Sequence, residues 1–107
     1  HLTRLTSLNL DFSLANKVAD EGIKILSSQG LQYLTQLISL NLNFSFSHTI
    51  TDTGVNSLCS QLLKNLSHLV FLKIDLSTCS SVTTFTKSNI LRVFRYFGFK
   101  NIDPSKL

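Results

Sequence analysis

The chain has 107 residues and a formal net charge of +4 at pH 7, which leaves room for one domain with a moderate hydrophobic core. Its two cysteines are too few for a secreted scaffold stapled by disulfides, and no stretch approaches the roughly 18 apolar residues of a membrane-spanning helix. We therefore expect a cytoplasmic or otherwise intracellular protein. Residues 1–86 carry no net charge, so the whole excess of positive charge lies in residues 87–107.

A short stretch recurs along the chain at a fixed offset of 32 residues, at 5–13, 37–45 and 69–77. A fixed period of this length is the signature of a solenoid, in which each unit buries its apolar side against its neighbours. The pattern divides a single domain, 1–107, into units at about 5–36, 37–68 and 69–97, with 98–107 as a tail. Residues 2–5 match the end of a unit whose beginning is missing, so we expect a piece of a longer protein.

The first half of each unit alternates between apolar and polar residues, which predicts a strand buried on one side. In the middle unit, for example, Leu40 and Leu42 alternate with Asn41 and Asn43. We expect three short strands whose inward side chains are Leu8, Leu10, Phe12, Leu40, Leu42, Phe44, Leu72, Ile74 and Leu76.

The second half of each unit changes to the spacing of a helix, with apolar residues three and four positions apart, as at Val55 and Leu58. We expect Asp20 and Asp52 to accept a hydrogen bond from a backbone N–H at the start of their own helices. The third unit departs from the pattern after its strand and could be a closing cap or a repeat cut short. Its helical stripe is carried by Ile90, Leu91, Phe94 and Phe97.

The apolar spacing matches the pattern L-x-x-L-x-L, carried by Leu5, Leu8 and Leu10 and by their equivalents in the later units. Behind it, residues 20–26 and 52–58 both read D-x-G-[IV]-x-x-L. With these motifs, residues 2 to about 97 resemble leucine-rich repeats of the type found in ribonuclease inhibitors. The resemblance implies an α/β solenoid with a curved parallel sheet on its concave side and helices on its convex side.

A second register fits part of the chain. Residues 74–83 read I-x-L-x-x-C-x-x-V-T, which resembles the cysteine-containing repeats found with F-box proteins. Because Ala15 and Ser47 stand at the cysteine position in the other units, we favour the ribonuclease-inhibitor-like register. Units this long also resemble expanded repeat arrays of single-celled eukaryotes, some of which lie beside kinase domains.

The resemblance implies a non-catalytic scaffold that recognises another protein through the outward side chains of the concave sheet. The alternative function is the targeting segment of a kinase-linked protein or of an F-box ubiquitin-ligase receptor. Carried over position by position, the expected binding surface consists of Ser7, Asn9, Asp11, Ser39, Asn41, Asn43, Phe71, Lys73 and Asp75.

The sequence holds no motif for phosphate binding, acyl transfer or zinc proteolysis, so we expect no catalysis, cofactor, metal or small-molecule ligand. Cys59 lies on an inward helical stripe and is expected in the core. Cys79 lies in a polar loop, where it could be exposed. No histidine stands at metal-ligand spacing from either cysteine.

Residues 92–100 interleave basic and aromatic side chains. We interpret this segment as the solvated outer face of an aromatic cap, and we do not expect a nucleic acid or a membrane as the partner. The alternative readings are a contact with another protein and a basic tail that binds nucleic acid or an anionic membrane surface.

Overall fold

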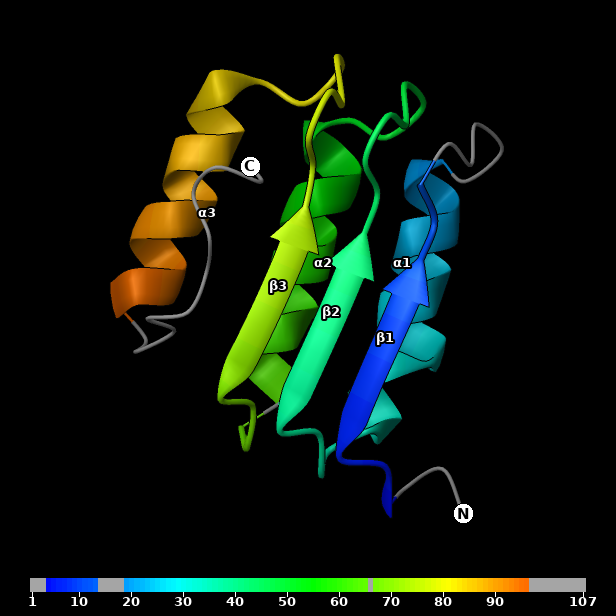
Figure 1. Cartoon of the computed structure of the whole chain (residues 1–107), viewed down its shortest axis with the longest axis vertical. Coiled ribbons are helices and arrows are strands. Elements are labelled where there is room, and N and C mark those ends of the chain that lie inside the picture. The colour runs from blue at the N-terminus through cyan, green and yellow to red at the C-terminus, as the bar shows by residue number, and fades with distance from the viewer. Residues whose placement is uncertain (1–3, 14–18, 66, 97–107) are drawn as a thin grey trace.

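The computed structural model describes residues 4–13, 19–65 and 67–96, which form three parallel strands and three α-helices. The elements in chain order are β1 (Ser7–Asp11), α1 (Asp20–Gln29), the short 3-10 helix η2 (Leu31–Tyr33), β2 (Ser39–Asn43), α2 (Asp52–Asn65), β3 (Phe71–Asp75) and α3 (Thr84–Tyr96). The strands lie side by side in the order β1-β2-β3 (Figure 1). The fold is therefore α/β. Within the described residues no helix has the length and apolar character needed to cross a membrane.

The three strands pair at the same offset of 32 residues that the sequence repeats. Ser7 is paired with Ser39 in a parallel ladder, and Ser39 is paired with Phe71. Each later position of the strands is paired in the same way, without a slip. The predicted strands and their register are confirmed, and residues at equivalent positions of the three units form straight rows across the sheet.

The predicted inward side chains form the core between the sheet and the helices. Leu40, Leu42 and Phe44 are at most 1% exposed, whereas Leu8 and Leu10 in β1 are only half-buried. An edge position alone does not explain the difference, because β3 is also an edge strand and its Leu72 and Ile74 are at most 2% exposed. α3 lies beyond β3 and adds Ile90 and Phe94 to the core, whereas no described helix or strand lies beyond β1 (Figure 1). Phe12 extends this row beyond β1, where its ring stacks on that of Phe44 with centroids 5.5 Å apart.

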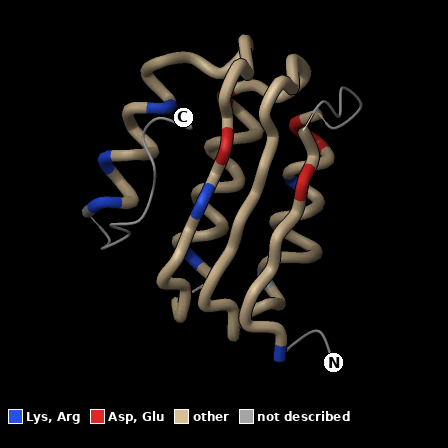
Figure 2. The backbone as a smooth tube through the Cα atoms, viewed as in Figure 1, with Lys and Arg blue, Asp and Glu red and all other residues tan. Residues whose placement is uncertain are grey.

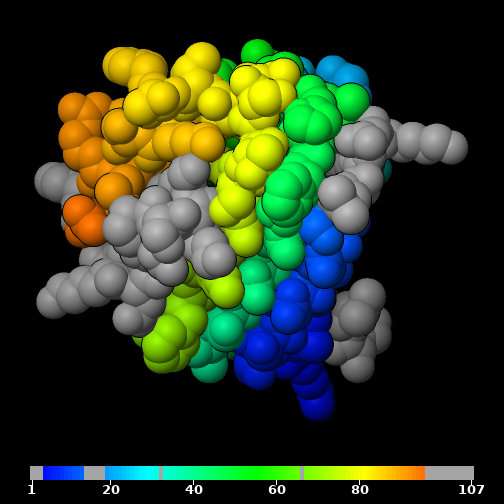
Figure 3. Space-filling view, turned by 45° about the horizontal axis from the view of Figure 1, so that its top comes forward, coloured from blue at the N-terminus to red at the C-terminus, as the bar shows by residue number. Residues whose placement is uncertain are grey.

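One face of the sheet is left uncovered by α1 and α2, which lie behind the strands in Figure 1; we call it the open face. The side chains of the three strands are visible next to one another in the space-filling view (Figure 3). The strands carry few charges (Figure 2), namely Asp11 on β1 and Lys73 and Asp75 on β3.

The connections that leave β2 and β3 make the same tight turn. Phe46 and Thr78 occupy equivalent positions and have φ angles of 63° and 58°, in the left-handed region that side chains with a Cβ rarely adopt. These turns send Ser47 and Cys79 into the core, where each is at most 2% exposed. The expectation that Cys79 could be exposed is therefore wrong, because its thiol is buried and donates to the carbonyl oxygen of Phe44 at 3.0 Å.

The helices do not pack at equal distances from one another. α1 packs closely along α2, and Gly54 makes this possible because a Cβ there would lie 2.9 Å from Cγ and 3.1 Å from Cα of Asp20. Thr86 holds the equivalent position in α3, and α3 contacts α2 less extensively than α1 does. A depression of about 160 Å³ lies between α2 and α3, lined in part by Cys59, Leu63 and Phe94.

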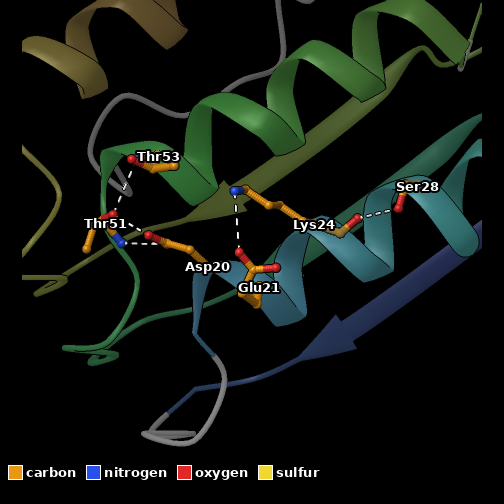
Figure 4. Close-up of polar contacts among 6 residues, drawn as sticks. All are labelled: Asp20, Glu21, Lys24, Ser28, Thr51 and Thr53. Atoms are coloured by element: carbon orange, nitrogen blue, oxygen red, sulfur yellow. Dashed lines mark hydrogen bonds and ion pairs between the residues drawn. The ribbon is translucent and has the colours of Figure 1, made fainter.

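Asp20 and Asp52 join neighbouring units and do not cap their own helices. Asp20 is the first residue of α1, and its carboxylate accepts hydrogen bonds from the Thr51 backbone N–H at 2.9 Å and from the Thr51 hydroxyl (Figure 4). Asp52 accepts the equivalent pair from Thr83, at 2.8 and 2.7 Å. We call these two contacts the Asp–Thr bridges. The predicted capping role is wrong, because each carboxylate is turned toward the loop of the next unit.

The second Asp–Thr bridge predicts a dependence of stability on pH. Hydrogen bonds from the Thr83 hydroxyl and backbone N–H lower the pKa of Asp52 from its ordinary value of 3.8. A lowered pKa in the folded state means that this stabilisation is present above pH 3.8 and is lost as the pH falls through the folded-state value. We expect Asp52→Asn to lose less stability than the wild type between pH 6 and pH 3, measured by urea unfolding. An identical loss in both proteins would contradict the prediction.

Candidate functional site

The nine residues predicted to form a binding surface lie on the three strands at alternating positions, opposite to the buried apolar residues. Because the strands are in register, the nine side chains form three rows across the open face. The first row is Ser7, Ser39 and Phe71; the second is Asn9, Asn41 and Lys73; the third is Asp11, Asn43 and Asp75.

The third row supports the fold at the ends of the strands. The side-chain oxygen of Asn43 accepts a hydrogen bond from the Ser45 backbone N–H at 2.9 Å. Asp11 and Asp75 make the same contact with the residue two positions on, also at 2.9 Å. Hydrogen bonds from Ser13 lower the pKa of Asp11. These Asx turns begin the connections to the helices, so this row has a structural role beside any role in binding.

The side chains of the first and second rows do not form turns of this kind. Within the described residues, none of their six side chains makes a hydrogen bond or an ion pair with another part of the fold. Four of the six are exposed and two, Ser39 and Asn41, are half-buried. The described part of the fold therefore leaves their polar atoms unoccupied.

A shallow depression of about 250 Å³ lies in these two rows, between β2 and β3. Its outward lining comes from Ser39 and Asn41 on β2 and from Phe71 and Lys73 on β3. Ile38 and Val70, just before the two strands, are 44% and 52% exposed. An apolar area therefore adjoins the depression at the start of the strands.

The side chains with the most reactive chemistry do not gather into a site. His48 contacts the Ser80 hydroxyl through Nδ1 at 2.9 Å. Burial raises the pKa of the Cys59 thiol to about 12, and burial also raises that of Cys79, so both are protonated at neutral pH. Among the described residues, no three His, Cys, Asp or Glu side chains lie together where they could hold a metal ion.

Two features of the open face were not predicted from the sequence. The Asx turns have a visible signal, because a serine follows each residue of the third row two positions later, at Ser13, Ser45 and Ser77. The exposure of Ile38 and Val70 has a weaker signal, since each stands beside an inward leucine and breaks the alternation. Both sit at the position that Thr6 holds in the first unit.

Part of the predicted basic segment lies outside the described residues, namely 97–100 together with the remainder of the tail. Within α3, Arg92 and Arg95 are exposed, and Arg92 donates to the side chain of Asn89 at 2.6 Å. No family model matches the chain, and no curated protein or solved structure matches it either.

Proposed function

We propose that the chain is a segment of a leucine-rich-repeat solenoid and that it serves as a non-catalytic scaffold for recognising another protein. The offset of 32 residues supports the repeat assignment, because the strands, the turns and the Asp–Thr bridges all recur at this offset. The pattern L-x-x-L-x-L supplies the inward residues of each strand, which are buried in β2 and β3 and half-buried in β1. Both cysteines are unpaired in the fold, which agrees with an intracellular setting.

The observation that carries the recognition role is the contrast between the two sides of the sheet. The inward side chains pack in the core, while the six side chains of the first two rows have no hydrogen-bond or ion-pair partner within the described fold. A rigid sheet that presents rows of uncommitted polar and aromatic side chains can bind a complementary surface without reordering its backbone. This arrangement favours recognition by shape and hydrogen bonding.

A second candidate is the targeting segment of an F-box ubiquitin-ligase receptor or of a kinase-linked protein. One observation favours the F-box type. Ser47 and Cys79 are buried at equivalent positions, each three residues after a buried apolar residue, as the cysteine-containing register requires. An F-box or a kinase domain in the same full-length protein would decide for this candidate.

Site-specific photo-crosslinking in the full-length protein tests the proposed recognition role. A photoreactive amino acid at Asn9 or Asn41 probes the open face, and the same group at Ser60 or Lys64 probes exposed positions on α2. We expect protein adducts from the open-face positions and none of the same mass from α2. Adducts from α2 alone, or from none of the four positions, would contradict the proposal.

A further inference from the structure

The third unit changes its outward residues while it keeps its inward ones. Leu72 and Ile74 preserve the buried apolar positions of the strand, but Phe71 and Lys73 replace the serine and asparagine that both earlier units carry. The fold does not require this change, because both residues are exposed and Ser39 and Asn41 occupy the adjoining positions of β2. The difference therefore concerns what the surface contacts.

Three exposed apolar residues have neighbouring backbones at the start of β2 and β3. Ile38, Val70 and Phe71 are 44%, 52% and 51% exposed. The backbone N–H groups of Val70 and Phe71 both donate to the carbonyl oxygen of Ile38, at 2.8 and 2.9 Å, which places the three residues next to one another. The first unit has the polar residues Thr6 and Ser7 at these positions. Exposed apolar residues grouped at the end of an otherwise polar sheet indicate a contact site.

A single positive charge borders this apolar area. Among the described residues, Lys73 is the only charged one that lines the depression between β2 and β3, and it forms no ion pair with another of them. Asp75, the next charged residue along β3, has one carboxylate oxygen engaged by the Ser77 backbone N–H. Because Phe71 and Lys73 are two positions apart on one strand face, their side chains start about 7 Å from each other.

We propose that this corner of the open face, formed by Ile38, Ser39, Asn41, Val70, Phe71 and Lys73, binds a protein segment with an apolar side chain beside a carboxylate. The apolar side chain packs on Phe71 and the carboxylate pairs with Lys73. Two residues of an extended segment, separated by one residue, span the required distance of about 7 Å. Phe71 and Lys73 lie at alternating exposed positions on the face of β3, whereas an added strand would pair at the edge of the sheet. The proposed contact is therefore made by side chains.

This assignment rests on the proposed recognition role, and a peptide selection can test it separately. A phage-displayed library of random heptapeptides is selected on the wild-type protein, with counter-selection on the double variant Phe71→Ser, Lys73→Asn. This variant carries the residues of β2 at the equivalent positions of β3, so we expect its thermal unfolding to match the wild type. We expect the selected peptides to be enriched in Asp or Glu two positions from an apolar residue.

The affinity of one selected peptide, measured by fluorescence anisotropy, should fall about tenfold in the double variant. Lys73→Glu should shift the selected sequences toward Lys and Arg. Ser60→Ala, an exposed change on α2 away from the open face, should leave the affinity unchanged. Selected peptides without acidic enrichment, or with equal affinity for the double variant, would overturn this assignment. In that case, protein adducts at Asn9 and Asn41 would still support the broader recognition role of the open face. Loss of oligonucleotide or anionic-vesicle binding in the double variant, with peptide binding unchanged, would also overturn it.

Discussion

Replacing Leu42 with Ala is expected to lower the free energy of unfolding by about 3 kcal/mol, while the same replacement of Leu10 lowers it by about half as much. The two leucines hold equivalent positions in adjacent strands. Leu42 is fully buried in the central strand, so its removal leaves a cavity that the packed neighbours cannot fill. Leu10 is half-buried in an outer strand and gives up less contact area.

Urea unfolding of both variants at the same pH measures this difference directly. The wild-type chain and Asn9→Ala, an exposed change in the same strand as Leu10, serve as references. Equal losses for Leu42→Ala and Leu10→Ala would mean that β1 is as enclosed as β2. That result would contradict the packing described above.

The largest effect of a single added methyl group is expected at Gly54. Replacing Gly54 with Ala should destabilise the chain by about 2 kcal/mol, although Ala favours a helix by up to about 1 kcal/mol over Gly. The new Cβ would displace the Asp20 carboxylate, and the first Asp–Thr bridge would lose its two hydrogen bonds from Thr51. Hydrogen bonds to a charged group outweigh the gain in helix propensity.

Gly22 provides the matched control because it holds the equivalent position at the start of α1 and is exposed. Gly22→Ala should therefore be neutral or raise the free energy of unfolding by up to about 1 kcal/mol. Thermal unfolding should show a lowered midpoint for Gly54→Ala and an unchanged or raised midpoint for Gly22→Ala. A stabilising Gly54→Ala would show that α1 and α2 do not depend on this close approach.

The strands and their register could be predicted because both depend on a local pattern that is repeated. Alternation identifies the buried side of each strand, and the offset of 32 residues aligns Leu8 with Leu40 and Leu72. The same alternation predicts which side chains of each strand lie on the open face. The positions of all nine expected surface residues could therefore be read without knowledge of the turns.

The roles of Asp20, Asp52 and Cys79 could not be predicted because they depend on partners that are distant in the chain. An aspartate at a helix start normally bonds within its own first turn, but the Thr51 donors lie 31 residues after Asp20. Cys79 looked solvated because polar residues surround it in sequence. Its burial depends on the left-handed backbone of Thr78. A β-branched residue rarely adopts this conformation, so the sequence does not indicate the turn.

The Asp–Thr bridges also bear on which block of the chain could be joined to a copy of itself. Thr51 and Asp52 are adjacent in the chain, and each belongs to a different bridge. The unit at 37–68 thus offers a donor to the unit before it and an acceptor to the unit after it. The first unit has Ala19 in place of the threonine, and the third has Thr84 in place of the aspartate. If the middle block were duplicated in tandem, the aspartate of one copy could pair with the threonine of the next. Two copies of either outer block would lack one of these two side chains.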